Sequence, residues 1–461
     1  MVFSSILFLF IYLPVVLLVY YLVPVRYRNV WLFAVNLIFY GWGEPVYILL
    51  MLFSICLNYV NGLWIARCRE TDGRKAKRIL AVNTAVNLLM LVFFKYFDLI
   101  AVTLSRLPFL SIPTLGLSLP IGISFYTFQT MSYPIDVYRG DSEVQKNFIS
   151  FGTFVALFPQ LIAGPIVRYK DVASQLAFRA NSSKQFASGV ERFVIGLGKK
   201  VLIANNLGLL WDSYAASAGR TAVGAWLGAI AFSLQLYYDF SGYSDMAIGL
   251  GRMLGFEFLE NFNFPYISRS ITEFWRRWHI SLGTWFRDYL YIPLGGNRRG
   301  LPRQVLNILI VWALTGLWHG ANWTFLLWGL YYAVFLIIEK LFLLKRLERS
   351  RTLCHVYTLI VTVFGWMLFQ LDSVKETLLY WGNMLGSGGF CSAFDLYQLR
   401  SYALILILAI VFATPLLREF YACVSDRTKY ILSPVLAALV LVLSTAYLVD
   451  ATYNPFLYFR F

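Results

Sequence analysis

Residues 430–449 read YILSPVLAALVLVLSTAYLV and contain no charged side chain. An apolar helix of roughly 17 to 25 residues can cross the hydrocarbon core of a bilayer. Lipid offers no partner to backbone N–H and C=O groups, and continuous rather than alternating apolar runs favour helices over a barrel. Comparable runs recur near residues 79–98, 114–128, 149–167, 190–211, 222–250, 304–345, 353–371 and 402–417. We therefore expect an all-α, polytopic membrane protein.

Composition extends this prediction to the whole chain. Of the 461 residues, 59% are hydrophobic and only 14% are charged, whereas a soluble domain carries about 25% charged residues. No hydrophilic linker or internal repeat divides the sequence. We predict a single domain over residues 1–461, with about 11 to 13 membrane-embedded helices.

The basic residues predict the topology. The first span, Phe3 to Val23, has no basic residue before it and is followed by Arg26 and Arg28. A cleavable signal peptide has the reverse order, so we expect an uncleaved helix with its N-terminus outside. Three crossings then place the basic loop 67–78 in the cytoplasm, as the positive-inside rule requires. The net charge of +15 is therefore explained by basic cytoplasmic loops, and it would also suit binding of anionic lipid or of an anionic substrate. Binding of nucleic acid is not expected.

Several kinds of site are not expected. The five cysteines form no C-x-x-C pair, and the three histidines, His279, His319 and His355, are far apart. A disulfide framework and a zinc site are therefore not predicted. The sequence also contains no P-loop, G-x-S-x-G or H-E-x-x-H motif.

The polar region at about residues 235–325 is the place where we expect chemistry. It is rich in charge between Asp239 and Arg303, so it should lie at an interface, line a cavity or be partly re-entrant. Within it, Asp239, Ser241 and Ser244 could cap a broken helix. Structural roles are favoured for this stretch, with cavity lining as the alternative.

His319 is the first candidate catalytic residue. It lies in VWALTGLWHGANW, residues 311–323, and no charged residue falls between Arg303 and Glu339. Burial disfavours the charged form of imidazole, which keeps it available as a base. Gly316 and Gly320 would let a helix or a ligand come close. The alternative is a histidine that forms hydrogen bonds between helices.

His279 is the second candidate, in EFWRRWHISLGTWFRD, residues 273–288. On one helix, Trp275, Trp278 and Leu282 would form a stripe, which is typical of an amphipathic interfacial helix. The pattern alone favours such a basic membrane-surface helix. The alternative hypothesis makes Arg276 and Arg277, which flank the stripe, a phosphate clamp for an anionic cofactor.

Together these segments resemble the membrane-bound O-acyltransferase family, and its bacterial alginate O-acetyltransferase branch in particular. The resemblance runs from end to end of the chain. Gln370 departs from it, because arginine is expected there in many relatives. The matching stretches are LPIGISFYTFQ (119–129), FPQLIAGPIVR (158–168), DFSGYSDMAIGLG (239–251), NFNFPY (261–266), FWRRWHISL (274–282), LWHG (317–320) and NPFLYFRF (454–461).

The resemblance implies a bowl of membrane helices around a central tunnel, with a catalytic histidine that matches His319 and a second that matches His279. It also implies an acetyl-coenzyme A donor from the cytoplasm, no permanently bound cofactor, and an extracytoplasmic acyltransferase partner that modifies an exported polysaccharide.

From these implications we expect Arg276, Arg277, Lys199 and Lys200 to hold the coenzyme A phosphates. His319 would act as a general base or a transient acyl carrier, in a multi-pass protein of the bacterial inner membrane. The alternatives are O-acyl transfer to peptidoglycan or teichoic acid, and a transporter or flippase for a lipid-linked sugar.

Overall fold

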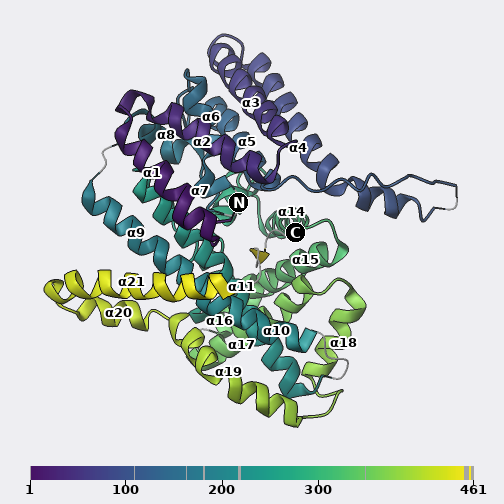
Figure 1. Cartoon of the computed structure of the whole chain (residues 1–461). Coiled ribbons are helices and arrows are strands. Elements are labelled where there is room, and N and C mark those ends of the chain that lie inside the picture. Colours follow the sequence, from purple (N-terminus) through teal and green to yellow (C-terminus); the bar gives the residue numbers. More distant parts are fainter. Residues whose placement is uncertain are drawn as a thin grey trace. The chain divides into compact units, whose positions relative to one another are not determined.

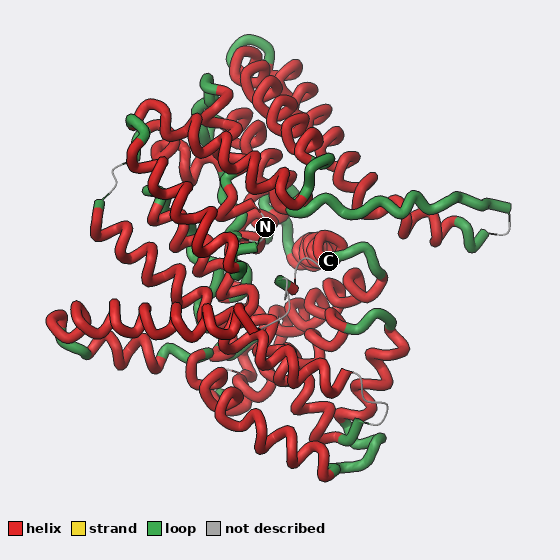
Figure 2. The backbone as a smooth tube through the Cα atoms, viewed as in Figure 1, coloured by secondary structure: helices red, strands yellow, loops and turns green. Residues whose placement is uncertain are grey.

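The computed structural model describes residues 2–107, 109–161, 164–179, 182–215, 220–347, 349–450 and 456–457. In this part of the chain the regular structure is helical, and no strand occurs (Figure 2). The all-α prediction is therefore confirmed. The chain forms two compact units, Met1–Phe193 with Tyr243–Leu259, and Val194–Gly242 with Glu260–Phe461. Each is described by itself below.

Unit 1 contains the N-terminal helices and the C-terminal part of a long helix, α11 (Figure 1). Its apolar runs become helices; α1 ends at Leu22, two residues before Pro24, and α2 ends at Gly43, two residues before Pro45, as proline punctuation predicts. Its helices are η1 Phe8–Tyr12, α1 Leu13–Leu22, η2 Val25–Tyr27, α2 Arg28–Gly43, α3 Ile48–Arg69, α4 Gly73–Leu104, α5 Ile123–Arg139, α6 Phe148–Ala156, α7 Phe158–Leu161, α8 Tyr169–Ala177 and most of α9 Ser183–Gly198.

The α3–α4 pair is joined by side-chain hydrogen bonds between buried asparagines. Asn61 Nδ2 donates to Asn83 Oδ1 (2.8 Å), and Asn83 Nδ2 donates to Asn58 Oδ1 (2.9 Å). Asn58 and Asn87 also exchange hydrogen bonds, at 3.1 and 3.2 Å. In lipid such polar contacts hold helices together because no hydrophobic effect acts between them. The basic loop 67–78 lies at the turn of this hairpin.

Unit 2 contains the helices that build the candidate site. Its helices are η3 Lys199–Ala204, α10 Asn205–Ala215, α11 Ala222–Met253, η4 Pro265–Ile267, α12 Ile271–Arg277, α13 Ile280–Phe286, η5 Arg287–Tyr291, α14 Leu301–His319, α15 Trp323–Ile338, η6 Glu339–Leu343, α16 Leu344–Leu347, α17 Arg351–Gln370, α18 Val374–Met384, α19 Ala393–Phe412, α20 Leu416–Cys423 and α21 Asp426–Asp450.

Two glycines bring α14 and α15 into close contact. A Cβ atom on Gly316 would overlap the carbonyl oxygen of Phe325 and lie 3.3 Å from the Cα atom of Gly329. A Cβ atom on Gly329 would overlap the carbonyl oxygen of Trp312. Small residues of this kind allow membrane helices to pack backbone against backbone. The contact fixes the last turn of α14, which carries His319.

Eight described helices are long and apolar enough to cross a membrane, and Phe8–Leu22 is a shorter apolar helix. This confirms a multi-pass membrane protein. The sidedness of the loops, the single domain, the central tunnel and the total of embedded helices stay predictions.

Two local predictions are wrong. Residues 111–120 form no helix, because Pro113 and Pro120 favour extended backbone in the residues before them; the helix starts at Ile123. The predicted helix break near Asp239 is also absent, since α11 runs unbroken from Ala222 to Met253. There the Asp239 carboxylate pairs with Lys200 (2.5 Å) and Asp245 pairs with Arg192 (2.6 Å) instead of capping a helix. The structural role favoured for this stretch fits both pairs.

Candidate active site

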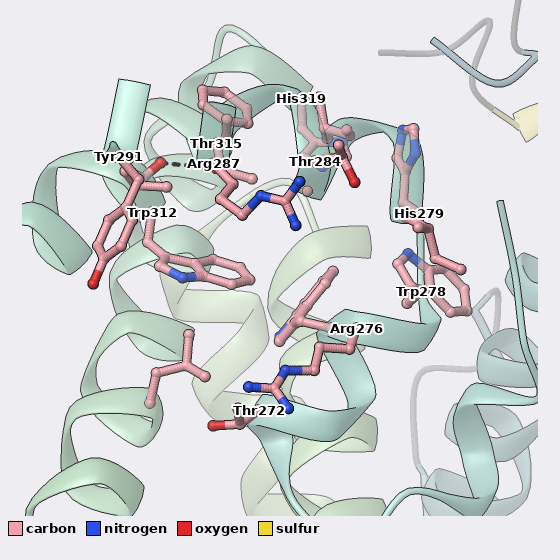
Figure 3. A pocket seen from close by; sticks show the side chains of 17 residues that line it. Thr272, Arg276, Trp278, His279, Thr284, Arg287, Tyr291, Trp312, Thr315 and His319 are labelled. Carbon is pink, nitrogen blue, oxygen red and sulfur yellow. Dashed lines mark hydrogen bonds between the residues drawn. The ribbon is translucent and has the colours of Figure 1, made fainter. Parts of the chain in front are cut away.

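A cavity of 610 Å³ lies within unit 2 and has both His279 and His319 in its wall (Figure 3). His279 lies at the junction of α12 and α13 and His319 ends α14, 40 positions later in the sequence, so the fold brings together the two histidines singled out above. The lining residues are Thr272, Trp275, Arg276, Trp278, His279, Ile280, Leu282, Gly283, Thr284, Phe286, Arg287, Tyr291, Val311, Trp312, Thr315, His319 and Leu336.

Helix α12 is fixed at its start by the buried carboxylate of Glu339. This group accepts hydrogen bonds from the backbone N–H groups of Ile271 (2.6 Å) and Thr272 (2.8 Å) and from the Thr272 hydroxyl (2.6 Å). Ser270 caps the same end by accepting from the Glu273 N–H (3.0 Å). A carboxylate at a helix N-terminus satisfies the unpaired N–H groups and interacts well with the helix dipole. The side chains of α12 are thereby held against the cavity.

At His279 the helix breaks. The residue has a φ of 45° and a ψ of 53°, left-handed values that are unfavourable for a side chain other than glycine and cost roughly 1 to 2 kcal/mol. The conformation is held by Asn261, whose backbone carbonyl oxygen accepts a hydrogen bond from the Ile280 N–H (3.0 Å). The predicted continuous interfacial helix is therefore wrong. Trp278 and Leu282 are both buried in protein, so the expected tryptophan at headgroup depth is absent at Trp278.

The His279 ring is buried among aromatic groups. Its centroid lies 4.7 Å from that of Phe240 and 6.0 Å from that of Trp318. His279 lies outside the candidate membrane spans, and burial lowers its pKa from the ordinary 6.5 to about 3. The imidazole is therefore neutral at physiological pH, because burial in a low-dielectric site disfavours its charged form.

His319 is the last residue of α14 and is 5% exposed. Its ring centroid lies 5.0 Å from that of Trp328 and 5.4 Å from that of Phe369. Trp318 packs edge-on against His319 (5.1 Å) as well as against His279. One indole ring thus contacts both imidazoles, and aromatic packing restricts both.

Two guanidinium groups form the cationic part of the cavity wall. Arg276, on α12, and Arg287, at the start of η5, both line the cavity (Figure 3). Arg287 also pairs with Asp288 at 2.7 Å. Among the described lining residues there is no carboxylate. A wall with two cations and no lining acid suits a polyanionic ligand such as a pyrophosphate.

The remaining predicted cofactor residues have other contacts. Arg277 pairs with Glu273 (2.9 Å) and donates to the Asn263 carbonyl (3.1 Å), and it does not line the cavity. Lys200 is bound to Asp239, whose second oxygen accepts from the Leu457 N–H (2.8 Å). Lys199 and Lys200 are also absent from the cavity wall. A coenzyme-binding role for these three cations stays a prediction.

Sequence reasoning missed Arg287 and Asn261 as parts of the site. A signal for Arg287 existed, since it is a basic residue next to an apolar stretch, eight positions after His279. His355 was interpreted as an ordinary residue, and its Nδ1 atom lies 3.1 Å from the Ser268 carbonyl oxygen, away from the cavity wall.

Comparison with known proteins shows the family of this chain. The sequence model of the membrane-bound O-acyltransferase family, MBOAT, matches residues 120–381. The chain is 43% identical over 433 residues to the probable alginate O-acetylase AlgI of Azotobacter vinelandii, covering 92% of this chain and 86% of that protein. It is 41% identical to the protein of the same name from Pseudomonas putida, over the full length of both. A peptidoglycan O-acetyltransferase of Helicobacter pylori is 33% identical over 84% of this chain and 80% of its own length.

The chain therefore belongs to the membrane-bound O-acyltransferase family. It is an O-acyltransferase with several helical spans, as the sequence motifs predicted. The terminal motif, residues 454–461, lies outside the described residues except for Phe456 and Leu457.

Proposed function

We propose that the chain transfers an acetyl group from cytoplasmic acetyl-coenzyme A across the membrane, for O-acetylation of an exported, alginate-like polysaccharide. The single observation that carries the proposal is the cavity in which two arginines and two histidines share one wall. Arg276 and Arg287 would hold the phosphates of the coenzyme. The thioester would lie toward His279 and His319.

In this proposal His319 is the general base. It takes the proton from the acceptor hydroxyl, the oxygen bonds to the acyl carbon, and the carbon–sulfur bond breaks. The proton then passes to the leaving thiolate, so coenzyme A leaves as the thiol. His279 assists by accepting a hydrogen bond that orients the hydroxyl. The apolar lining around both rings excludes water and limits hydrolysis of the thioester.

The acceptor is assigned from relatives. Two relatives named as alginate O-acetylases cover most of this chain at 41% and 43% identity, which favours an alginate-like glycan in the bacterial inner membrane system. A separate extracytoplasmic acyltransferase would complete the transfer. Peptidoglycan is the second candidate acceptor, because a relative that is 33% identical is named as a peptidoglycan O-acetyltransferase.

The test replaces His319 with alanine in the native host and uses His355→Ala as the matched control, because His355 does not line the cavity. Surface glycan and peptidoglycan are analysed separately by mass spectrometry, and exported glycan is quantified. We expect His319→Ala to lose acetylation of the exported glycan while export continues. Loss of acetyl groups from peptidoglycan alone would show that peptidoglycan, and not the exported glycan, is the acceptor. Lost export with normal acetylation of the residual glycan would identify a transporter instead.

A further inference from the structure

We propose that Asn261 is a positioning residue that holds His279 in one tautomer, with its proton on Nδ1 and its Nε2 lone pair facing the cavity. The inference rests on the proposed function and deepens it. It gives His279 a defined chemical role, as a hydrogen-bond acceptor, and makes a residue 18 positions earlier responsible for it.

The hydrogen bonds around Asn261 fix the direction of each proton. Its Oδ1 atom lies 3.1 Å from the Ser281 backbone N, 2.9 Å from Ser281 Oγ and 3.2 Å from His279 Nδ1. A backbone N–H can only donate, so this Asn261 atom must be the carbonyl oxygen and not the amide nitrogen. A carbonyl oxygen can only accept. His279 Nδ1 must therefore carry a proton, and the neutral ring must leave Nε2 unprotonated.

Burial makes the arrangement hard to change. Asn261 is fully buried and His279 is 3% exposed. A rotated Asn261 amide would place its NH₂ group against the Ser281 N–H, two donors facing each other. The backbone adds a second constraint, because the Asn263 N–H donates to the Arg277 carbonyl (2.9 Å). The strand-like segment 261–263 thus lies along residues 277–281 and keeps His279 in its left-handed conformation.

The other ring nitrogen, Nε2, has no hydrogen-bond partner among the described residues. It is buried, although His279 lines the cavity. Its ring neighbours, Phe240 and Trp318, are uncharged at neutral pH. The charged side chains of the same wall are the cations Arg276 and Arg287, and His319 is its other titratable imidazole. Burial disfavours a charged His279, which keeps the lone pair present.

The direct test is ¹⁵N nuclear magnetic resonance of the full-length protein in lipid, with labelled histidine. Only three histidines occur in the chain, so variants of His319 and His355 assign the signals. We expect His279 to show a protonated Nδ1 and an unprotonated Nε2. A protonated Nε2 with an unprotonated Nδ1 would overturn the inference. This result is independent of activity, so it separates the inference from the proposed function, which fails if His319→Ala acetylates the exported glycan normally.

A second test changes the charge at Asn261 and keeps its shape. Asn261→Asp retains an oxygen for Ser281 but places a carboxylate beside the imidazole, which raises the pKa of the ring by about 1 to 3 units. From the wild-type value of about 3, a new acid limb should appear in the pH–rate profile of kcat below about pH 6. The imidazolium should appear in the nitrogen spectrum over the same range. An unchanged profile and spectrum would contradict the proposal.

Asn263→Asp is the matched control. It makes the same chemical change two residues away, in the same segment, on a side chain that is exposed and lies outside the cavity wall. We expect its kcat profile to match the wild type. If Asn261→Asp fails to accumulate in the membrane, the tautomer measured on the wild type still decides the question.

Discussion

Replacing Gly316 with alanine should reduce both stability and activity. The new Cβ atom would overlap the Phe325 carbonyl oxygen and lie 3.1 Å from the Phe325 carbonyl carbon and 3.3 Å from Gly329 Cα, whereas ordinary contacts are 3.4–4 Å. These neighbours are backbone atoms, so relief requires α14 and α15 to separate by about 1 Å, and overpacking of this kind costs about 1 to 3 kcal/mol.

The same shift should reach His319, the proposed catalytic residue, because Gly316 is one turn before it on α14. A displacement of about 1 Å at a reacting group can lower the rate about 100-fold. The assay compares thermal unfolding in detergent with glycan acetylation in cells, normalised to the amount of protein in the membrane. Gly73→Ala is the control, because a Cβ atom there meets nothing within 4 Å. Wild-type stability and acetylation in Gly316→Ala would refute the close-contact argument.

Three further results are expected. Burial holds the pKa of folded His279 near 3 against 6.5 ordinarily, so the unfolded protein binds the extra proton and stability rises with pH between these values; His279→Gln should remove this dependence from pH-resolved unfolding curves. Lys200→Met should cost about 3 to 5 kcal/mol by leaving the Asp239 carboxylate buried without its cation, and Asp239→Leu in the same chain should restore much of the loss in thermal unfolding. Asn83→Leu should cost about 1 to 3 kcal/mol, because it removes the hydrogen-bond partner of the Asn61 amide and one of the two hydrogen bonds to Asn58 Oδ1; an unchanged unfolding midpoint would exclude a stabilising role for the Asn83 hydrogen bonds.

Much of the fold was predictable because its signals are local. The apolar runs of α3, α4 and α21 are long enough to identify membrane helices without tertiary information. The errors occur where distant residues override the local pattern. The segment around Asp239 looked too polar for a continuous helix, and only the position of Lys200, which comes from another helix, explains why α11 continues.

The site was predictable in part for the same reason. His319 stood out as an ionisable group in an apolar run, and His279 matched a family motif. The break at His279 was not predictable, because Asn261 holds it from 18 positions away. The local sequence also could not predict which of two neighbouring arginines lines the cavity. Arg276 faces the cavity, whereas Arg277, one residue later, turns to Glu273.

The most direct test of the central claim is an electron cryomicroscopy structure of the full chain in lipid with a non-hydrolysable acetyl-coenzyme A analogue. The account predicts density for the phosphates beside Arg276 and Arg287, with the acyl group at His279 and His319. Analogue density elsewhere in the chain, with this cavity containing none, would contradict it.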